Sequence, residues 1–380
     1  MKFVAEALNL TPPAAERLGE RNILKSALIK HPFFGDIIEA YKLEKKFGDY
    51  EEGTLIAKTK NGLEVVRGYP KIRRALTLYP TIKRRFRGNV ALEEKMNGYN
   101  ARIALLGENI YGITRRGYIC PYTTEKAREL IDITFFQDHP SLMLCCEAVG
   151  EESPFVPKTT YGVKIDFYVF DIREKRSNRP LSIKEKERLC DEYSLNMAPI
   201  LEVVDAEKAH EVAFELVRKL GEEGREGIVF KDVEMKREPI KYTSSQSNCG
   251  DLRYAFRYFN DYGRDFMFSR IVREGFQSFE LKESQEEFRE RCLRLGMSIL
   301  QPMVESIREV AEGKKITEKT RLSFSSMETL RLFKEHVRRM GIEAIFGDVE
   351  EKDGKYVVTF ERVMVSTTDK IKGHLKGGLW

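Results

Sequence analysis

Hydrophobic residues recur with two different periods along this 380-residue chain, and each change of period indicates a change of structure. Thr11-Pro12-Pro13 favours a helix start, because proline suits the first helical turn. We expect helical structure from there to about residue 48. Further on, short apolar stretches flank Asn61-Gly62, a dipeptide typical of the turn in a β-hairpin. Residues 1–65 therefore form a predicted small N-terminal module.

Residues 66–245 mix strand and helix patterns without the regular alternation of a parallel α/β fold. A helix is predicted over 205–220, where Asp205 suits the N-cap and Gly221 the end. Apolar density predicts strands at residues 90–92, 99–106, 142–149, 166–172 and 227–230. These patterns indicate a mixed α+β domain.

The composition changes after residue 243, and the remaining chain divides into two parts. Residues 244–250 are small and polar, which predicts a linker. Residues 246–315 then form a predicted helical segment. Strand-like stretches around a helical one at 327–340 predict a small α+β domain over residues 316–380.

Four aromatic residues recur at every fourth position of the helical segment: Tyr254, Tyr258, Tyr262 and Phe266. Arginines flank them at positions 253, 257 and 264. Such a stripe is more typical of a core or a subunit interface than of a platform that stacks nucleic-acid bases. It is therefore a candidate surface for self-association.

Composition adds a weak electrostatic signal. Hydrophobic residues make up 42% of the chain, enough for sizeable cores, and the net charge is only +5. A local basic cluster is clearer, and it predicts either RNA binding or a solvated surface; its residues are Lys83, Arg84, Arg85 and Arg87. The charged fraction of 33% also suggests ion-pair networks of the kind found in heat-stable proteins. A melting temperature below about 60 °C would count against that idea.

The six cysteines include no C-x-x-C pair, and no histidine lies at zinc-ligand spacing from them. We expect no structural metal and a reducing, cytoplasmic location. Acidic residues such as Glu6 and Glu16 stand where a signal peptide needs an apolar stretch. No apolar run approaches transmembrane length, so no membrane partner is expected.

Lys95 is the candidate nucleophile. It follows an apolar strand and precedes Gly98, where a missing side chain lets a phosphate approach the backbone. Lys-x-x-Gly alone is a weak signal, and this chain repeats it at Lys45 and Lys370. An attacking amine must be unprotonated, so its pKa must fall from about 10.4. Lys231 and Lys241 are cations that would lower it and also neutralise triphosphate oxygens.

Three further residues have both a chemical and a purely structural interpretation. Glu147 ends an apolar strand and needs a partner, either a sugar hydroxyl or an arginine. Phe170 lies in an aromatic-rich strand, where it offers a ring to a purine or packs in the core. Glu226 is a candidate magnesium carboxylate. It lies five positions before Lys231, on the opposite face of an extended strand, so the two are not simply one surface ion pair.

Six motifs in chain order resemble the collinear motifs of the covalent nucleotidyltransferases, the superfamily of ATP-dependent DNA ligases, RNA ligases and mRNA capping enzymes. They are Lys95-x-x-Gly98, Thr114-Arg115-Arg116-Gly117, Glu147, Phe170-Asp171, Glu226-Gly227 with Lys231, and Lys241. The chain is most similar to the archaeal homodimeric ATP-dependent RNA ligases, over most of its length. Asn100 agrees with the RNA ligases that seal double strands, whereas Thr243 stands where many relatives carry a second lysine.

The resemblance implies an α+β nucleotidyltransferase domain of antiparallel sheets and helices, followed by a helical dimerisation segment. It implies that Lys95 attacks the α-phosphate of ATP and that Glu147 binds the ribose, while Phe170 stacks on adenine. Arg115 or Arg116 touches the ribose or a phosphate. Further implied contacts are Gly98 and Asn100 with the nucleotide, Glu226 with Mg²⁺ or Mn²⁺, and Lys231 and Lys241 with phosphate oxygens.

The implied function is an ATP-dependent RNA ligase that joins 5′-phosphate and 3′-hydroxyl ends, including the two ends of one strand. Two alternatives share this chemistry, a DNA ligase and a capping guanylyltransferase. The helical pattern after Lys241 favours neither of them, because it does not predict an OB-fold. A non-catalytic RNA-binding dimer is the alternative of another class, and it would bind RNA without forming covalent AMP.

Overall fold

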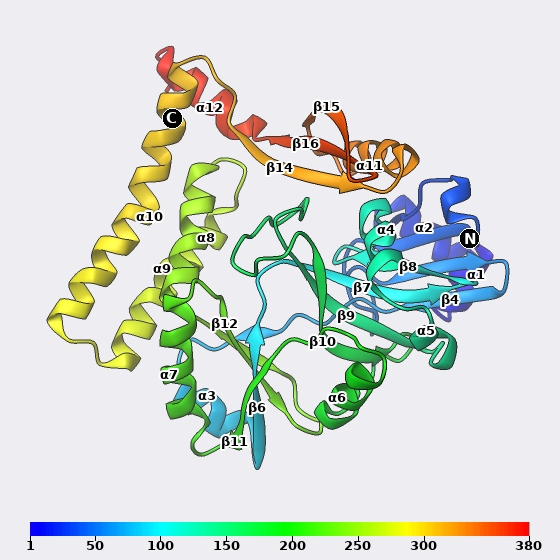
Figure 1. The fold of residues 1–380 in the computed structure, drawn as a ribbon, viewed down its shortest axis with the longest axis horizontal. Helices are drawn as coiled ribbons and strands as arrows, with labels where there is room; N and C mark the ends of the chain where they lie inside the picture. The colour runs from blue at the N-terminus through cyan, green and yellow to red at the C-terminus, as the bar shows by residue number, and fades with distance from the viewer. Residues whose placement is uncertain (380) are drawn as a thin grey trace.

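The computed structural model describes residues 1–379 and arranges them as four β-sheets with helices packed around them (Figure 1). The first sheet has the antiparallel order β1-β2-β3-β4. Its elements are α1 (Lys2–Ala7), α2 (Pro12–Glu20), β1 (Leu24–Ser26), η1 (Pro32–Phe34), β2 (Ile37–Leu43), β3 (Leu55–Thr59) and β4 (Gly62–Val66). The hairpin predicted at Asn61-Gly62 is confirmed. The predicted helix to residue 48 is wrong, because Asn22 adopts a left-handed backbone (φ 54°) and strands follow α2.

Two sheets form the centre of the molecule. One is antiparallel with the order β10-β9-β7-β8; the other has the order β11-β6-β12-β13-β5, in which only β5 and β13 are parallel. The strands are β5 (Arg73–Arg74), β6 (Asn89–Lys95), β7 (Tyr99–Leu106), β8 (Asn109–Thr114), β9 (Leu142–Val149), β10 (Asp166–Glu174), β11 (Ile200–Asp205), β12 (Gly227–Asp232) and β13 (Ile240–Thr243). The α+β class with antiparallel sheets is thus confirmed.

Separate cores cover the outer faces of these sheets. The β7–β10 sheet packs against the first sheet on one face and against α4, α5 and α6 on the other. The second sheet packs against α3 and α7. These helices are α3 (Leu78–Arg85), α4 (Pro121–Leu130), α5 (Thr134–Asp138), α6 (Ile183–Glu192) and α7 (Ala209–Glu222). Asp205 ends β11 instead of capping α7, whose N-cap is Lys208.

Three long helices follow the second sheet: α8 (Ser245–Arg257), α9 (Arg264–Leu281) and α10 (Gln285–Ala311). The linker predicted over 244–250 is wrong, because Ser244 caps α8 through its side chain and the helix begins at once. Tyr254, Tyr258 and Tyr262 contact one another and pack in a core with Ile316, Met364 and Ile371. The aromatic stripe is therefore core and not a free surface.

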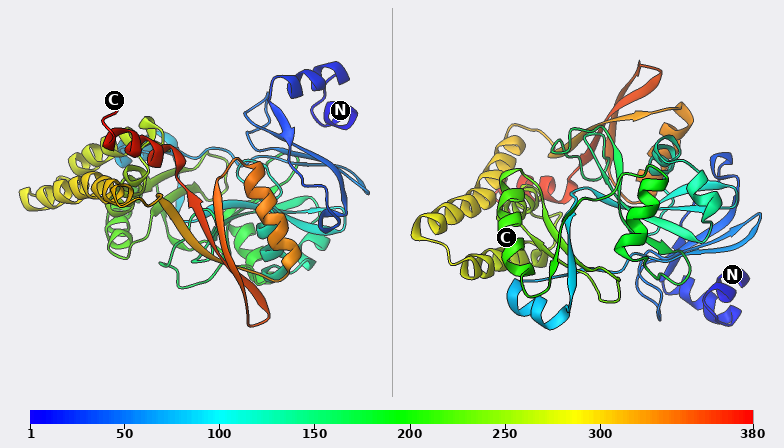
Figure 2. Two further views of the ribbon diagram at one scale, coloured as in Figure 1. Left: turned by 90° about the horizontal axis from the view of Figure 1, so that it is seen from above. Right: turned by 60° about the horizontal axis from the view of Figure 1, so that its bottom comes forward.

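The C-terminal part is a three-stranded antiparallel sheet of order β14-β16-β15 with two helices. Its elements are β14 (Thr317–Phe324), α11 (Met327–Arg339), β15 (Ala344–Lys352), β16 (Lys355–Val363) and α12 (Val365–Leu375). The views in Figure 2 place the N-terminal module and α10 at opposite ends of the molecule, with the two central sheets between them. Across residues 1–379, every helix is too short or too polar to cross a membrane.

Candidate active site

Lys95 is the last residue of β6 and lies where the chain leaves one central sheet for the other. Its Nζ lies 2.6 Å from Oε2 of Glu226, because Gly227 pairs with Lys95 across the two strands and Glu226 precedes it. The two side chains are 19% and 13% exposed. The predicted nucleophile and the predicted metal carboxylate therefore meet, and Glu226 does not pair with Lys231.

The turn after Lys95 brings Gly98 against β9. A Cβ at Gly98 would lie 2.2 Å from the carbonyl oxygen of Ala148, so only glycine fits. The structure thus gives a packing reason for this glycine, in place of the phosphate approach expected from the sequence. The Gly98 amide donates to Oε1 of Glu147 over 3.2 Å, which fixes that carboxylate at the pocket wall.

Asn100 and Glu147 are paired across β7 and β9 and both line the pocket. The Oδ1 atom of Asn100 is buried and accepts no hydrogen bond from residues 1–379. Burial, the largest cause, and the charge of Glu226 together raise the pKa of Glu147 to about 7, against the opposing charge of Lys95. An acceptor and a half-ionised carboxyl without strong partners are suited to binding hydroxyl or amino groups of a ligand.

Phe170 reaches the pocket through a β-bulge. The pairing of β10 with β9 is interrupted between Val169 and Asp171, so Phe170 has no cross-strand partner. Its ring lines the pocket and contacts the ring of Tyr69 edge-on, with centroids 5.0 Å apart. The Tyr69 hydroxyl donates to Asp171 over 2.7 Å, which anchors this aromatic pair. The Phe170 ring is therefore held in place at the pocket wall, where a purine ring could stack on it.

Lys231 is fully buried, and three acceptors surround its ammonium group. Nζ lies 2.6 Å from Glu93, 2.8 Å from Asp171 and 2.6 Å from the carbonyl oxygen of Phe170. Burial opposes its charge, but the two carboxylates outweigh burial and raise the pKa of Lys231. Because an ammonium has three donors, this network leaves none for a phosphate. The geometry supports the bracing interpretation over the phosphate contact implied by the resemblance.

Lys241 has the opposite environment. It lines the pocket from β13 without an ion-pair partner in residues 1–379. Burial, followed by the charges of Lys95 and Arg74, lowers its pKa to about 8. Thr243 stands where many relatives carry a second lysine, and its hydroxyl accepts a hydrogen bond from the guanidinium of Arg74. Arg74 therefore adds a cation beside Lys241 that sequence reasoning missed.

The structure separates the two candidate arginines. Arg115 lines the pocket, with its guanidinium 5.9 Å from the ring centroid of Tyr69. Arg116 instead lies near Lys42 and Tyr118, outside the pocket lining. The nearby Arg102 is fully buried and donates to backbone carbonyls, including Gly53 and Thr114 at 2.8 Å. Of the two arginines, Arg115 is thus the one that lines the pocket.

Two neighbouring carboxylates of the pocket were not predicted. Glu93 and Glu94 are 1% and 3% exposed, at the end of the apolar strand β6. Glu93 pairs with Lys186 and Lys231, and Glu94 accepts two hydrogen bonds from Arg225 at 2.8 and 2.7 Å. Adjacent glutamates in a buried strand require such cations, so the sequence did carry a signal for them.

The basic cluster does not form a single patch, because α3 divides it. Arg84 and Arg85 line one hollow, and Lys83 and Arg87 line another. The Arg87 guanidinium donates to the backbone carbonyls of Lys83 and Phe86, and Arg85 lies 3.8 Å from Glu238. The arginines on the first side are therefore the better candidates for nucleic-acid contacts.

Comparison with known proteins identifies the family. Residues 88–243 match the family model for RNA ligase, and residues 254–378 match the model for the C-terminal region of ligase Pab1020. A solved structure of an archaeal ATP-dependent RNA ligase superposes with a TM-score of 0.91 at 41% identity, over 100% of this chain and 99% of that one. This chain belongs to the archaeal ATP-dependent RNA ligase family.

Two other relatives of this ligase differ in how they are described. An uncharacterized protein of Methanocaldococcus jannaschii is 42% identical over 99% of this chain and 96% of its own length. A provisionally named ATP-dependent DNA ligase from Aquifex aeolicus is 26% identical, with a TM-score of 0.88 over 97% of this chain and 100% of that one. The family predicted from the six motifs is confirmed.

The carboxylates of this ligase fit a hard divalent cation. Glu226 and Glu147 are close enough for the charge of one to raise the pKa of the other, so a cation near them would relieve their repulsion. Within residues 1–379 no group of three or more histidine, cysteine, aspartate or glutamate side chains can hold a metal. Magnesium bound to phosphates usually takes only one or two protein carboxylates, with the remaining ligands from phosphate and water.

Proposed function

We propose that this protein uses ATP to join RNA 5′-phosphate and 3′-hydroxyl ends, within one strand or between two, through an AMP bonded to Lys95. One observation carries the proposal: the Lys95 amine, oriented by Glu226 at 2.6 Å, faces a pocket lined by Asn100, Glu147, Phe170 and Lys241. Family membership supports the same activity.

In the first step, Nζ of Lys95 attacks the α-phosphorus of ATP. A nitrogen–phosphorus bond forms, the bond to the β-phosphate oxygen breaks, and pyrophosphate leaves. The amine loses a proton, for which the Glu226 carboxylate is the near acceptor. Lys241 and Arg115 line the same pocket, and both would neutralise phosphate oxygens there. A divalent cation, when bound, supplies further charge neutralisation at those oxygens.

Two transfers complete the reaction. An oxygen of the RNA 5′-phosphate attacks the phosphorus of the adenylate, the bond to Lys95 breaks, and the amine recovers its proton. The 3′-hydroxyl then attacks the 5′-phosphorus of the adenylylated RNA, loses its proton and expels AMP. Each step is a displacement at phosphorus, in which positioning and charge neutralisation provide most of the catalysis.

The decisive experiment is incubation with labelled ATP and magnesium, followed by denaturing electrophoresis. We expect a labelled band that is sensitive to acid, as a phosphoramidate is, and that Lys95→Ala abolishes. Adding RNA with a 5′-phosphate should discharge the label. Labelling that persists in Lys95→Ala would show that another residue is the nucleophile.

DNA ligation is the second candidate, because the Aquifex aeolicus relative is provisionally named a DNA ligase. The higher identity to the archaeal RNA ligase, 41% against 26%, favours RNA. Offering matched RNA and DNA strands, single and nicked, to the adenylylated enzyme separates the two. GTP in place of ATP tests a capping activity in the same assay.

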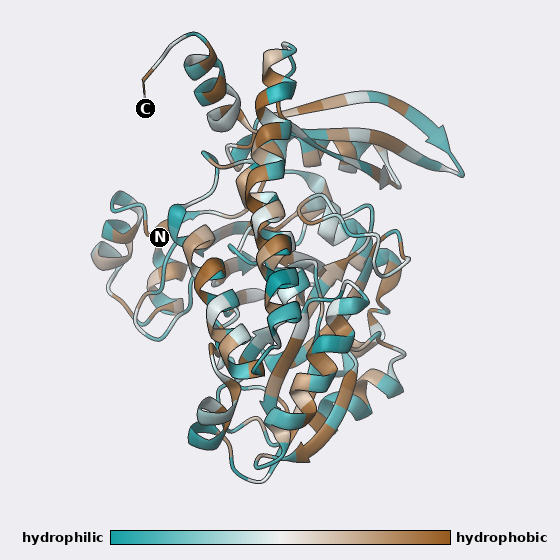
Figure 3. Cartoon of the chain, turned by 90° about the vertical axis from the view of Figure 1, so that its left-hand side faces the viewer, coloured by the Kyte–Doolittle hydropathy of each residue, from teal (hydrophilic) through white to brown (hydrophobic). Residues whose placement is uncertain are grey.

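We further propose that the enzyme is a homodimer assembled through α9 and α10. Large apolar side chains are exposed there: Phe268, Phe276, Phe279, Phe288, Leu293, Met297, Leu300 and Ile307. Leu293, Met297 and Leu300 lie four and three positions apart, a spacing that puts them on one face of α10. Figure 3 shows hydrophobic segments recurring along the long helix that faces the viewer. A contiguous apolar face of this kind is typical of an interface.

Light scattering tests the dimer. We expect about twice the chain mass of 44.1 kDa for the native protein and the monomer mass for Leu293→Asp with Leu300→Asp. Leu130→Asp, an equally apolar and exposed position on α4, is the matched control and should remain dimeric. A native protein of monomer mass would refute the proposal.

The cytoplasm is the proposed location, supported by six cysteines that all carry free thiols. The division into units 1–65, 66–245, 246–315 and 316–380 also stays a prediction. Limited proteolysis with mass spectrometry would test those boundaries.

A further inference from the structure

Arg74 continues the row of cations outward from the nucleotide pocket. Strand β5 pairs in parallel with β13, and Arg74 is the partner of Lys241, so both side chains lie on the pocket face of the sheet. No carboxylate within residues 1–379 forms an ion pair with Arg74, and its buried Nε has no acceptor there. A buried donor without an acceptor is unfavourable and indicates a missing partner.

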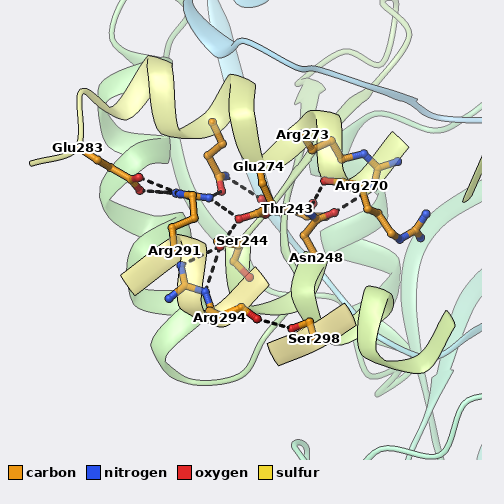
Figure 4. Close-up of polar contacts among 12 residues, drawn as sticks. Thr243, Ser244, Asn248, Arg270, Arg273, Glu274, Glu283, Arg291, Arg294 and Ser298 are labelled. Carbon is orange, nitrogen blue, oxygen red and sulfur yellow. Dashed lines mark hydrogen bonds and ion pairs between the residues drawn. The ribbon is translucent and has the colours of Figure 1, made fainter. Parts of the chain in front are cut away.

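Helix α9 brings two more arginines to the same place. Arg270 is neutralised by Asp251 at 2.6 Å, whereas the one hydrogen bond of the Arg273 side chain within residues 1–379 is a 3.4 Å contact with the amide oxygen of Asn248. In Figure 4, Arg270 and Arg273 point to the same side, away from Glu283 and Arg291. Burial, together with the charges of Arg74 and Arg270, lowers the pKa of Arg273 to about 9. The cluster therefore holds more positive charge than its carboxylates balance.

A buried network keeps α9 in position on the sheet. Glu274 accepts from Asn248 at 2.7 Å and from Arg291 at 2.6 Å, and Gln277 donates to the carbonyl of Thr243 at 3.0 Å. Glu274 and Arg291 are 2% and 4% exposed. Because the network joins α9 to the end of β13, Arg273 is held beside Arg74 before any ligand binds.

A basic groove leads away from this cluster. Its cavity is about 870 Å³, against about 170 Å³ for the nucleotide pocket. Six cationic residues line it, Arg73, Arg74, Arg84, Arg85, Lys236 and Arg237. One carboxylate lines it, Glu238, which pairs only with Arg85. An open groove with this charge suits a polymeric anion rather than a single nucleotide.

We propose that Arg74 and Arg273 bind the 5′-terminal phosphate of RNA, and that the adjoining nucleotides follow the basic groove. The inference rests on the proposed ligase activity, in which that phosphate must reach the adenylate on Lys95. Arg74 is paired with Lys241, which lines the same pocket as Lys95, and Arg273 lines a hollow together with Arg74. They share no pocket with the nucleotide, so RNA fits them better than the triphosphate of ATP does.

The test compares one short single-stranded RNA with a 5′-phosphate or a 5′-hydroxyl. In fluorescence anisotropy, the native protein should bind the phosphorylated form more tightly, and Arg273→Ala should lose about tenfold of that preference. In Arg273→Ala, the rate of RNA adenylylation should fall about tenfold more than the rate of self-adenylylation by ATP. Arg264→Ala, on the same helix at an exposed position, is the matched control and should keep the native preference.

Several outcomes would overturn the inference. A 5′-phosphate preference unchanged in Arg273→Ala would show that the cluster does not bind the RNA end. A loss of self-adenylylation as large as the loss of RNA adenylylation would assign the arginines to the leaving pyrophosphate. The binding preference tests the inference even if the protein forms no AMP adduct. Absence of the adduct would contradict the ligase proposal, whereas absence of the preference would contradict the inference.

A conservative variant controls for a folding defect in Arg273→Ala. Arg273→Lys keeps the charge but not the planar fork, and it should retain part of the preference at an unchanged melting temperature.

Arg84→Ala with Arg237→Ala tests the groove, because it removes two of its cations at exposed positions. The slope of binding against salt should then fall by about 1.4, the value for two phosphate contacts on a single strand. An unchanged slope would show that RNA does not follow the groove.

Discussion

Lys95 and Lys231 project from neighbouring, paired strands, yet the protein surrounds them in opposite ways. Lys231 is fully buried and contacts Glu93, Asp171 and the Phe170 carbonyl. Lys95 is 19% exposed and, among the described residues, forms one ion pair, with Glu226. Three acceptors hold a lysine charged and fixed, whereas one acceptor at a pocket wall orients an amine and leaves it accessible. The number of acceptors around each ammonium group, more than its position in a motif, distinguishes the structural Lys231 from the reactive Lys95.

The carboxylates follow the same division. Burial tends to raise the pKa of Asp171, but Lys231 and Arg173 outweigh burial and lower it. Glu147 lies in the Lys95 half of the site, and burial raises its pKa to about 7. The Lys231 end of the site is therefore electrostatically satisfied, and the Lys95 end is left with groups that a ligand must satisfy.

The largest expected effect is on catalysis at the Lys95 end. Lys95→Ala should lose all covalent AMP, because Lys95 is the amine that contacts Glu226 at the pocket wall, and should still join RNA adenylylated in advance. Its unfolding free energy should change by about 1 kcal/mol or less, as for a partly exposed ion pair. Labelling gels and urea unfolding measure the two effects. Failure to join adenylylated RNA would show that Lys95 also serves the last step.

The Lys231 end should respond in the opposite way. Lys231→Met leaves buried carboxylates short of a cation, so the unfolding free energy should fall by roughly 3–5 kcal/mol, read from urea midpoints. Lys241→Met is the matched control, since Lys241 is half-buried without an ion pair and its loss should leave stability unchanged. Native stability in Lys231→Met, together with lost adenylylation, would restore the phosphate contact implied by the resemblance.

The sequence predicted the family, the antiparallel α+β class and many of the strands, because each rests on local patterns of apolar residues and on motif order. It did not predict the roles of Arg74, Glu93 and Glu94. Their positions depend on which strands become neighbours, and β5 joins β13 across more than 160 residues. The helix expected near residue 40 failed for a related reason, since a half-apolar stretch is compatible with either structure until its sheet partners are known.

The pH dependence of stability should differ in sign between the two ends. Because the folded state holds the Glu147 proton more tightly than the unfolded state, Glu147 contributes stability below pH 4.5 that is lost as the pH rises through about 7. Relative to Glu147→Gln, the native protein should lose on the order of 1–3 kcal/mol over that range. Asp171→Asn should reveal the reverse, a contribution lost as the pH falls below about 4. Urea unfolding across pH measures both, and parallel curves would contradict the division.

The smallest effect separates the two adjacent arginines. Arg115 lines the pocket and Arg116 lies near Lys42, so only Arg115→Ala should weaken ATP binding. The loss of one charged contact should raise the KM for self-adenylylation about tenfold, or about 1.4 kcal/mol, while Arg116→Ala should change it less than about twofold. Stability should be native in both variants, because neither arginine forms an ion pair within residues 1–379. An equal rise in KM in both variants would mean that the loop holding the two arginines changes conformation when ATP binds and brings Arg116 to the nucleotide. The Lys95 end of the site would then take its final form only with the ligand bound.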